Sequence, residues 1–205
     1  MKPKFVSNSQ ESTRMFKSNF LELFSKVHFT VPLFLFVPVV LYFLYKTFFV
    51  LHVGVLYALV FFILGLLMWS LTEYVMHRFL FHYHPTSKFG QRIHFIFHGI
   101  HHDYPNDANR LVMAPAISIP LAFVYYYLFL IPLGEAYVAP FFTGFVLGYL
   151  LYDMTHYAIH HFAFKGGWWA KVKMHHMMHH YKDDENGYGV SSKLWDLIFN
   201  TDIKK

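Results

Sequence analysis

Long apolar runs separated by short polar segments dominate this chain of 205 residues. Four of these runs approach or exceed the roughly 20 residues that a helix needs to cross the hydrocarbon core of a bilayer. They cover residues 29–45, 48–71, 111–133 and 136–154. The pattern predicts an all-α integral membrane protein with four transmembrane helices.

Short connections predict that these helices pair as two hairpins. The first hairpin would turn near Tyr45–Thr47, and the second at the Pro-Leu-Gly sequence of residues 132–134, which favours a tight turn. The N-terminus, residues 72–110 and the C-terminal tail would then lie on one side of the membrane. Residues 29–205 would form the membrane domain.

Residues 1–28 form a separate leading segment that is polar and mixed in composition. We expect a loose cytosolic tail followed by an amphipathic helix over Ser12–Lys26. Four apolar side chains at helical spacing support this helix, and they would share one face. They are Phe16, Phe20, Leu21 and Phe24.

Composition and charge strengthen the membrane interpretation. Hydrophobic residues make up 56% of the chain and charged residues only 14%, against roughly 25% in typical soluble proteins. Every Lys and Arg except Lys46 falls on the side that holds the termini, which the positive-inside rule places in the cytoplasm. The membrane would be a bacterial inner membrane or the endoplasmic reticulum. The basic residues flank the apolar runs and form no separate patch, so we exclude nucleic acid as a partner.

Histidine supplies the candidate chemistry. The chain has 16 histidines and no cysteine, so any metal must rely mainly on imidazole. Ten histidines form four clusters: His77 and His82; His98, His101 and His102; His156 and His160; and His176, His179 and His180. Members three or four residues apart can point together from one helix face. The five-residue step from His77 to His82 predicts instead a helix end at which the chain unwinds.

Ten imidazoles indicate two metals, because one metal takes only about four to six ligands. All four clusters fall on the cytoplasmic side, so we expect a cytosolic histidine-rich dimetal cap on the helices. Imidazole accepts zinc, iron, copper or nickel, and two chemistries stay open. One is an oxygen-dependent oxidase with a redox metal, and the other is a zinc-dependent membrane lipid hydrolase. A metal transporter is disfavoured, because the span interiors hold essentially no ionisable residue.

Several residues near the clusters are candidates for supporting roles. Glu73 and Asp153 each lie about one helical turn before a cluster and are candidates to accept a hydrogen bond from a ligand imidazole. His94 and His161 are candidate neighbours of the ligands. Four tyrosines are weaker candidates for contacting a substrate headgroup, and an interfacial aromatic belt is the alternative. They are Tyr74, Tyr152, Tyr157 and Tyr181.

The segments around the clusters resemble the fatty acid hydroxylase/sterol desaturase superfamily of membrane di-iron enzymes, and within it the fatty acid 2-hydroxylases. The segments that carry the resemblance are Glu73–His82, His94–Asp103, Tyr152–His161, Met174–Tyr181 and Ser192–Thr201. The resemblance implies that the ten clustered histidines hold two iron ions at the cytosolic face, and that zinc can replace iron in a purified protein. It also implies O2-dependent hydroxylation at C2 of long-chain fatty acyl groups of sphingolipid-type lipids.

Eukaryotic members of this family often carry a cytochrome b5 domain with a His-Pro-Gly-Gly motif. This chain has only His84-Pro85, so we expect an external electron donor, either cytochrome b5-like or ferredoxin-type. The expected partners are this donor, the membrane and a lipid or fatty acyl substrate. Similar histidine patterns also serve carotenoid and sterol hydroxylases and desaturases, which stay open as the alternative.

Overall fold

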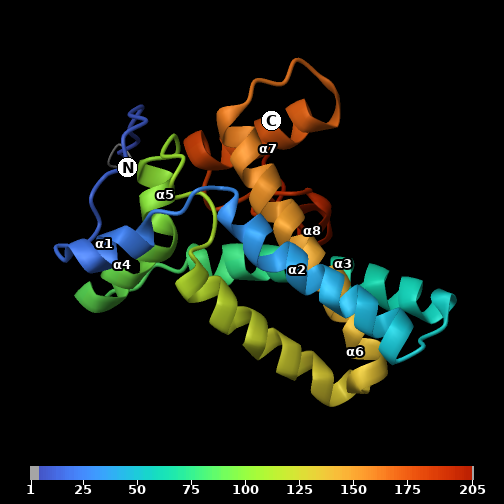
Figure 1. The fold of residues 1–205 in the computed structure, drawn as a ribbon. Helices are drawn as coiled ribbons and strands as arrows, with labels where there is room; N and C mark the ends of the chain where they lie inside the picture. The colour runs from blue at the N-terminus through green and yellow to red at the C-terminus, as the bar shows by residue number, and fades with distance from the viewer. Residues whose placement is uncertain (1–4, 205) are drawn as a thin grey trace.

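The computed structural model describes residues 5–204, and this part of the chain is helical without any strand (Figure 1). Residues 1–4 and Lys205, part of the expected tails, lie outside the described residues. Four helices have at most seven residues: α1 (Asn19–Ser25), α4 (Lys88–His94), α5 (Ile100–Asp103) and α8 (Leu194–Ile198). The longer helices are α2 (Val31–Tyr45), α3 (Val55–Val75), α6 (Pro115–His161) and α7 (Gly167–Tyr181).

Within residues 5–204, three continuous helical stretches are long and apolar enough to cross a membrane. The first is α2 with a π-helical extension, Val31–Val50, and the second is α3 with another, Val55–Phe81. The expected turn at Tyr45–Thr47 is wrong, because the first helix continues through these residues. Their polar groups are satisfied within the fold: Lys46 pairs with Glu135 at 2.6 Å, and the Thr47 hydroxyl donates to the Phe43 carbonyl.

The third stretch, α6, contains both of the remaining apolar runs. Its backbone departs from helical geometry at Gly134, where φ is 68° and ψ is 171°. Glycine suits this position because a positive φ carries no Cβ penalty there. The bend divides α6 into two arms that fold back on each other (Figure 1). The Lys46–Glu135 pair joins this bend to the end of the first helix, so the two turns lie at the same end of the bundle.

Helix α3 packs closely against the second arm of α6, and this contact sets how the histidine-bearing ends of the two helices are placed relative to each other. Gly65 and Gly144 allow the backbones to meet, since a Cβ on Gly65 would lie 1.9 Å from the Phe141 carbonyl oxygen. Aromatic rings fill the interface, with Trp69 edge-on to Phe145 and Tyr149. The histidine-bearing ends of both helices follow directly from this contact.

The leading segment differs from the expected helix over Ser12–Lys26. Only Asn19–Ser25 is helical, and the residues before it run in extended form over the histidine-bearing region. The buried guanidinium of Arg110 holds them there, donating to the Thr13 carbonyl and pairing with Glu22 at 2.8 Å. Ser7 also bonds through its backbone N–H to the Asp103 carbonyl. Tertiary bonds therefore replace helical ones over the first half of this segment.

Candidate metal centre

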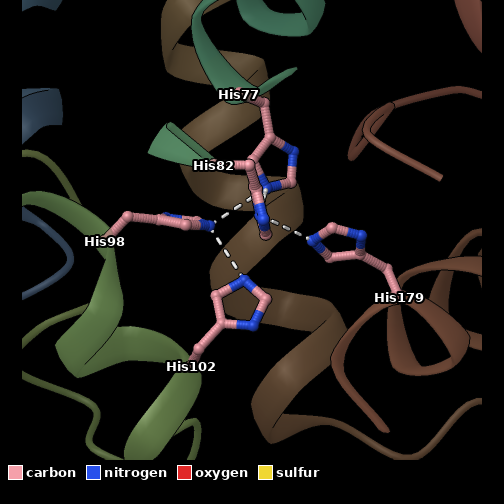
Figure 2. Close-up of side chains that lie close together, drawn as sticks. All are labelled: His77, His82, His98, His102 and His179. Carbon is pink, nitrogen blue, oxygen red and sulfur yellow. Dashed lines mark hydrogen bonds between the residues drawn. The ribbon is translucent and has the colours of Figure 1, made fainter. Parts of the chain in front are cut away.

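All ten clustered histidines meet where α3, α5, α6 and α7 come together, and they form two groups of five. The ligand-capable nitrogens within each group all lie within 4.8 Å of one another. Group one, drawn in Figure 2, consists of His77, His82, His98, His102 and His179. Group two consists of His101, His156, His160, His176 and His180.

The two groups interleave along the chain. His98 and His102 belong to group one, while His101 between them belongs to group two. On α7 the division is reversed, because His176 and His180 belong to group two and His179 between them belongs to group one. The expected triplets are therefore each split between the groups, with residues four apart kept together. The stacked rings of His102 and His180, 4.2 Å apart, join the groups directly.

A π-helical turn brings His77 and His82 together. The segment Met76–Phe81 is π-helical, and the His82 N–H donates to the His77 carbonyl at 3.1 Å. A hydrogen bond from residue i+5 to residue i places the two side chains over one another, which an α-helix does not do. The expectation that the chain unwinds after His77 is wrong, because the helix widens there. A second π-helical segment, Phe95–Gly99, carries His98.

The nitrogen positions fit metal ions and fit poorly with hydrogen bonding alone. Neighbouring Nε2 atoms are 2.9–3.2 Å apart in both groups. Ligands at about 2.1 Å from a metal and at right angles would be about 3.0 Å apart. The Nε2 of His176 faces three other Nε2 atoms, although a neutral imidazole nitrogen has one proton or one lone pair to offer. Converging lone pairs call for a central cation.

A loop between α7 and α8 orients group one. The Nδ1–H of His77 donates to the Tyr188 carbonyl at 2.5 Å, and that of His179 donates to the Asn186 carbonyl at 2.7 Å. These bonds leave the Nε2 lone pairs free to bind a metal, because the other nitrogen carries the proton. The loop thus fixes the tautomer and the ring orientation of two candidate ligands.

Two buried carboxylates hold this loop in place. Glu73 accepts bonds from the backbone N–H groups of Val190 and Ser191 and from the Ser191 hydroxyl, each at 2.8 Å. Asp196 accepts bonds from the backbone N–H groups of Tyr188 and Gly189. Glu73 therefore supports His77 through the loop, where the sequence suggested a direct bond to an imidazole. No role for Asp196 was predicted from the sequence, where the one signal was its position directly after Trp195 in the segment Ser192–Thr201 that carries the family resemblance.

Burial keeps the imidazoles neutral. The pKa values of His98, His101, His176 and His180 are lowered well below 6.5, first because burial disfavours the charged form and then because neighbouring histidines repel it. Neutral imidazole is the form that binds metal. Both groups are therefore ready to take up a cation near neutral pH.

A largely apolar cavity of about 660 Å³ ends at the histidines. It runs between the end of α3, the first arm of α6 and the leading segment. His98 of group one and His101 and His156 of group two form part of its wall. Its volume lies within the range of about 300–1,000 Å³ that is typical of ligand sites. The arrangement can hold a long apolar ligand with one end beside both groups.

Three of the remaining candidate residues line cavities. Tyr152 and Asp153 line the large cavity. His94 lines a second cavity of about 210 Å³, which reaches group one at His82 and His102.

The other candidates lie away from the large cavity. Tyr74 is buried, and its hydroxyl bonds to Thr201 and accepts a bond from Arg78. Tyr157 stacks on Phe29, and its ring lies 4.6 Å from that of His161. Tyr181 is exposed. Among the four tyrosines, only Tyr152 meets the large cavity.

Comparison with known proteins gives consistent matches. Residues 62–201 match the model of the fatty acid hydroxylase family. The fatty acid 2-hydroxylase of Rattus norvegicus is 42% identical, over 92% of this chain and 56% of its own length. The ceramide very long chain fatty acid hydroxylase scs7 of Schizosaccharomyces pombe is 41% identical, over 90% of this chain and 53% of its own length. The chain thus spans just over half the length of these relatives.

Two further matches cover more of the other protein. The dihydroceramide fatty acyl 2-hydroxylase FAH2 of Arabidopsis thaliana is 34% identical, over 93% of this chain and 80% of its own length. A solved structure, described as full-length scs7p with only the hydroxylase domain visible, superposes with a TM-score of 0.85. It is 35% identical, and the match covers 91% of this chain and 70% of that one.

Proposed function

Because this chain belongs to the fatty acid hydroxylase family, we propose that it is a membrane-bound fatty acid 2-hydroxylase acting on long acyl chains of sphingolipid-type lipids. One observation carries this proposal: ten neutral histidines gather in two groups at the end of an apolar cavity. In the reaction, one oxygen atom of O2 enters the C2–H bond as a hydroxyl. The other leaves as water, with two electrons and two protons supplied from outside.

The two groups would each hold one iron ion. Iron bound there would supply the redox chemistry that activates O2 and oxidises an unactivated C–H bond, which zinc cannot do. The protein's own residues do the rest of the work. The loop carbonyls of Tyr188 and Asn186 hold the ligand rings of His77 and His179, and burial excludes water from both groups.

The cavity would position the acyl chain. Its apolar wall, including Leu121 and Val124 of α6, accommodates the hydrocarbon and excludes water. Tyr152 and Asp153 lie in the wall on the same helix as His156 and provide polar groups for the carbonyl end of the substrate. C2 is the carbon next to this carbonyl, so anchoring the carbonyl end beside the histidines selects C2 for oxidation.

The two turns support the membrane arrangement that we propose. With the two arms of α6 counted separately, four apolar helices would cross the bilayer, and both ends of each hairpin would lie on the histidine side. The basic residues favour the cytoplasm for this side. The chain has no cysteine, so single cysteines report topology cleanly. A membrane-impermeant maleimide should label Glu185→Cys from the cytoplasmic side and Ala136→Cys from the opposite side; the reverse would refute this orientation.

The function is tested by lipid profiling of cells that express the protein with a competent electron donor, either cytochrome b5-like or ferredoxin-type. We expect new 2-hydroxy fatty acids in the sphingolipid fraction, which disappear without O2 and in the His179→Ala variant. His28→Ala is the matched control, because His28 is exposed and belongs to neither group. Hydroxylation confined to a sterol or carotenoid would refute the proposed substrate, and turnover without O2 would refute the proposed reaction.

A further inference from the structure

Helix α1 hides its carboxylate and exposes its apolar side chains. Glu22 is buried, and its carboxylate accepts bonds from the Met15 and Phe16 backbone N–H groups at 2.9 Å while pairing with Arg110. Phe20 and Leu23 point outward with 68% and 72% of their surface exposed. A helix in contact with water has the opposite arrangement. The surroundings of α1 are therefore apolar.

Helix α4 shows the same feature next to α1. Phe89 and Ile93 of α4 are 78% and 39% exposed. The two helices lie side by side (Figure 1), and Arg92 of α4 donates to the Met15 carbonyl just before α1. We call the four exposed side chains Phe20, Leu23, Phe89 and Ile93 the apolar platform. Two neighbouring short helices thus both expose large apolar side chains, and exposed apolar side chains that gather in one region of a soluble protein mark an interaction surface.

A short linker joins α1 to the first helix that is long enough to cross a membrane. Only residues 26–30 separate α1 from this helix, and the six steps from Ser25 to Val31 reach at most about 20 Å. Lys17 and Lys26 flank α1 and are exposed. Cations next to an interfacial apolar helix suit the anionic headgroups of lipids. Apolar side chains and charges together fit a lipid surface better than they fit a protein partner.

The same helix borders the large cavity. Leu21 and Phe24 of α1 line it and are themselves about half exposed, as are Leu80 at the end of α3 and Val124 of α6. Residues that both line a cavity and face outward form its rim. This rim consists of apolar side chains from α1 and from two membrane-crossing helices. The cavity therefore opens between α1 and these two helices.

We propose that the apolar platform is embedded in the lipid leaflet on the histidine side, and that Leu21 and Phe24 border a lateral opening to the cavity. An acyl chain reaches the histidines through this opening directly from the bilayer. The substrate class is then a lipid that already resides in the membrane, as opposed to a water-soluble acyl thioester. The part about the acyl chain rests on the proposed function, while the embedding of α1 does not.

Spin labels test the embedding without any assay of activity. The cysteine-free chain allows single nitroxide labels at Phe20→Cys and Leu23→Cys, with Glu11→Cys as the exposed control on the same segment. In nanodiscs that contain anionic lipid, we expect labels at 20 and 23 to be more accessible to O2 than to a water-soluble nickel chelate. The label at 11 should show the reverse. Labels at 20 and 23 that behave like the label at 11 would overturn the proposal.

Turnover tests the route of the substrate. The double variant Phe20→Gln/Leu23→Gln should hydroxylate a bilayer-embedded long-chain ceramide several-fold more slowly than the wild type. Its turnover of a detergent-dispersed short-chain ceramide should be unchanged, because neither residue lines the cavity. Equal rates for the variant and the wild type on the bilayer substrate would overturn the lateral route. A wild type without turnover on either substrate would refute the proposed function, and the spin labels would still decide the embedding.

Discussion

Each clustered histidine belongs to only one of the two groups, even where two histidines are adjacent in sequence. His179 and His180 differ by one position, yet the first belongs to group one and the second to group two. Both are buried in the described structure. A substitution at either position therefore removes one ligand from one group and leaves the other group complete. Neighbouring residues can thus be used to separate the roles of the two metals.

We predict that His179→Ala and His180→Ala each reduce the bound metal from about two ions per chain towards one, and that both abolish the hydroxylated product. The reason is that one missing ligand weakens its own site most strongly, and the reaction needs both sites. Metal analysis of the purified variants, together with product analysis, checks this. Full metal content with full activity in either variant would contradict the ligand assignment.

We also predict that the metal-free protein loses stability as the pH falls below about 6.5. The folded-state pKa values of His98, His101, His176 and His180 are lowered from 6.5. Below pH 6.5 the unfolded chain takes up protons that the folded protein does not, so the free energy of unfolding falls with decreasing pH. Above this pH these histidines add no slope.

The measurement is the thermal midpoint of the metal-free protein between about pH 8 and pH 5. Each buried histidine should cost about 1.4 kcal/mol per pH unit below its unfolded-state pKa. The midpoint should be nearly constant above pH 6.5 and should fall steeply below it. A midpoint that does not change between pH 7 and pH 5 would show that these imidazoles titrate normally.

At the residue scale, the sequence identified which ten histidines come together, because spacing and composition carry that information. It did not identify their division between the groups, because residues three and four apart share a helix face equally well. The role of Asp196 could not be predicted from the sequence either. Its bonds to Tyr188 and Gly189 exist only once the loop after α7 has closed against the helices.

The π-helical segment that follows α3 supplies two of the five histidines of group one. It places His77 and His82 over one another through one extra residue per turn. We predict that insertion of one alanine after Phe79 widens the step between these two histidines to six residues, which neither an α-helix nor a π-helix places on one face, and abolishes metal binding in group one. Phe79 is exposed, so an added residue at this position meets no core contact.

Metal analysis of the insertion variant, purified from the membrane fraction, checks this prediction. Phe79→Ala is the matched control, because it changes the same position and keeps the helix register. The control should retain about two metals per chain, and the insertion variant should retain at most one. Equal metal content in the two would mean that the π-helical register is dispensable.

The glycine contact between α3 and α6 fixes how these elements meet. A Cβ on Gly65 would approach the Phe141 carbonyl oxygen to 1.9 Å, and backbone atoms cannot move aside without separating the helices. We predict that Gly65→Ala lowers the thermal midpoint, with a cost of order 1–3 kcal/mol typical of overpacking. Gly54→Ala is the control, since its Cβ would meet nothing closer than 3.9 Å. Equal midpoints would contradict the close contact.

At the element scale, the apolar runs predicted the positions of the long helices correctly, but the ends predicted for the first two helices were wrong. The first helix passes through Lys46 and Thr47 because both find partners inside the fold, which the sequence does not reveal. The second helix continues to Phe81, beyond its apolar run, because tertiary contacts at the histidines support it. The turn at Gly134 was predictable, because Pro-Leu-Gly signals it locally.

The molecule as a whole combines two apolar hairpins, two histidine groups and a cavity that reaches both groups. The hairpins were evident in the sequence, since hydropathy and charge are local properties. The cavity was not, because its wall combines the leading segment, the ends of α3 and α5 and the first arm of α6. Only the folded chain shows that an apolar space reaches both groups, and this is why a lipid is the substrate that fits best.

Oxygen labelling of the purified protein is the decisive test of C2 hydroxylation. The protein, loaded with iron in nanodiscs, would receive a long-chain ceramide, a reducing system and ¹⁸O2. We predict one ¹⁸O atom at C2 of the acyl chain, and no labelled product from the His180→Ala variant. Oxygen at C2 derived from water, or no C2 product from protein that holds both metals, would contradict this prediction.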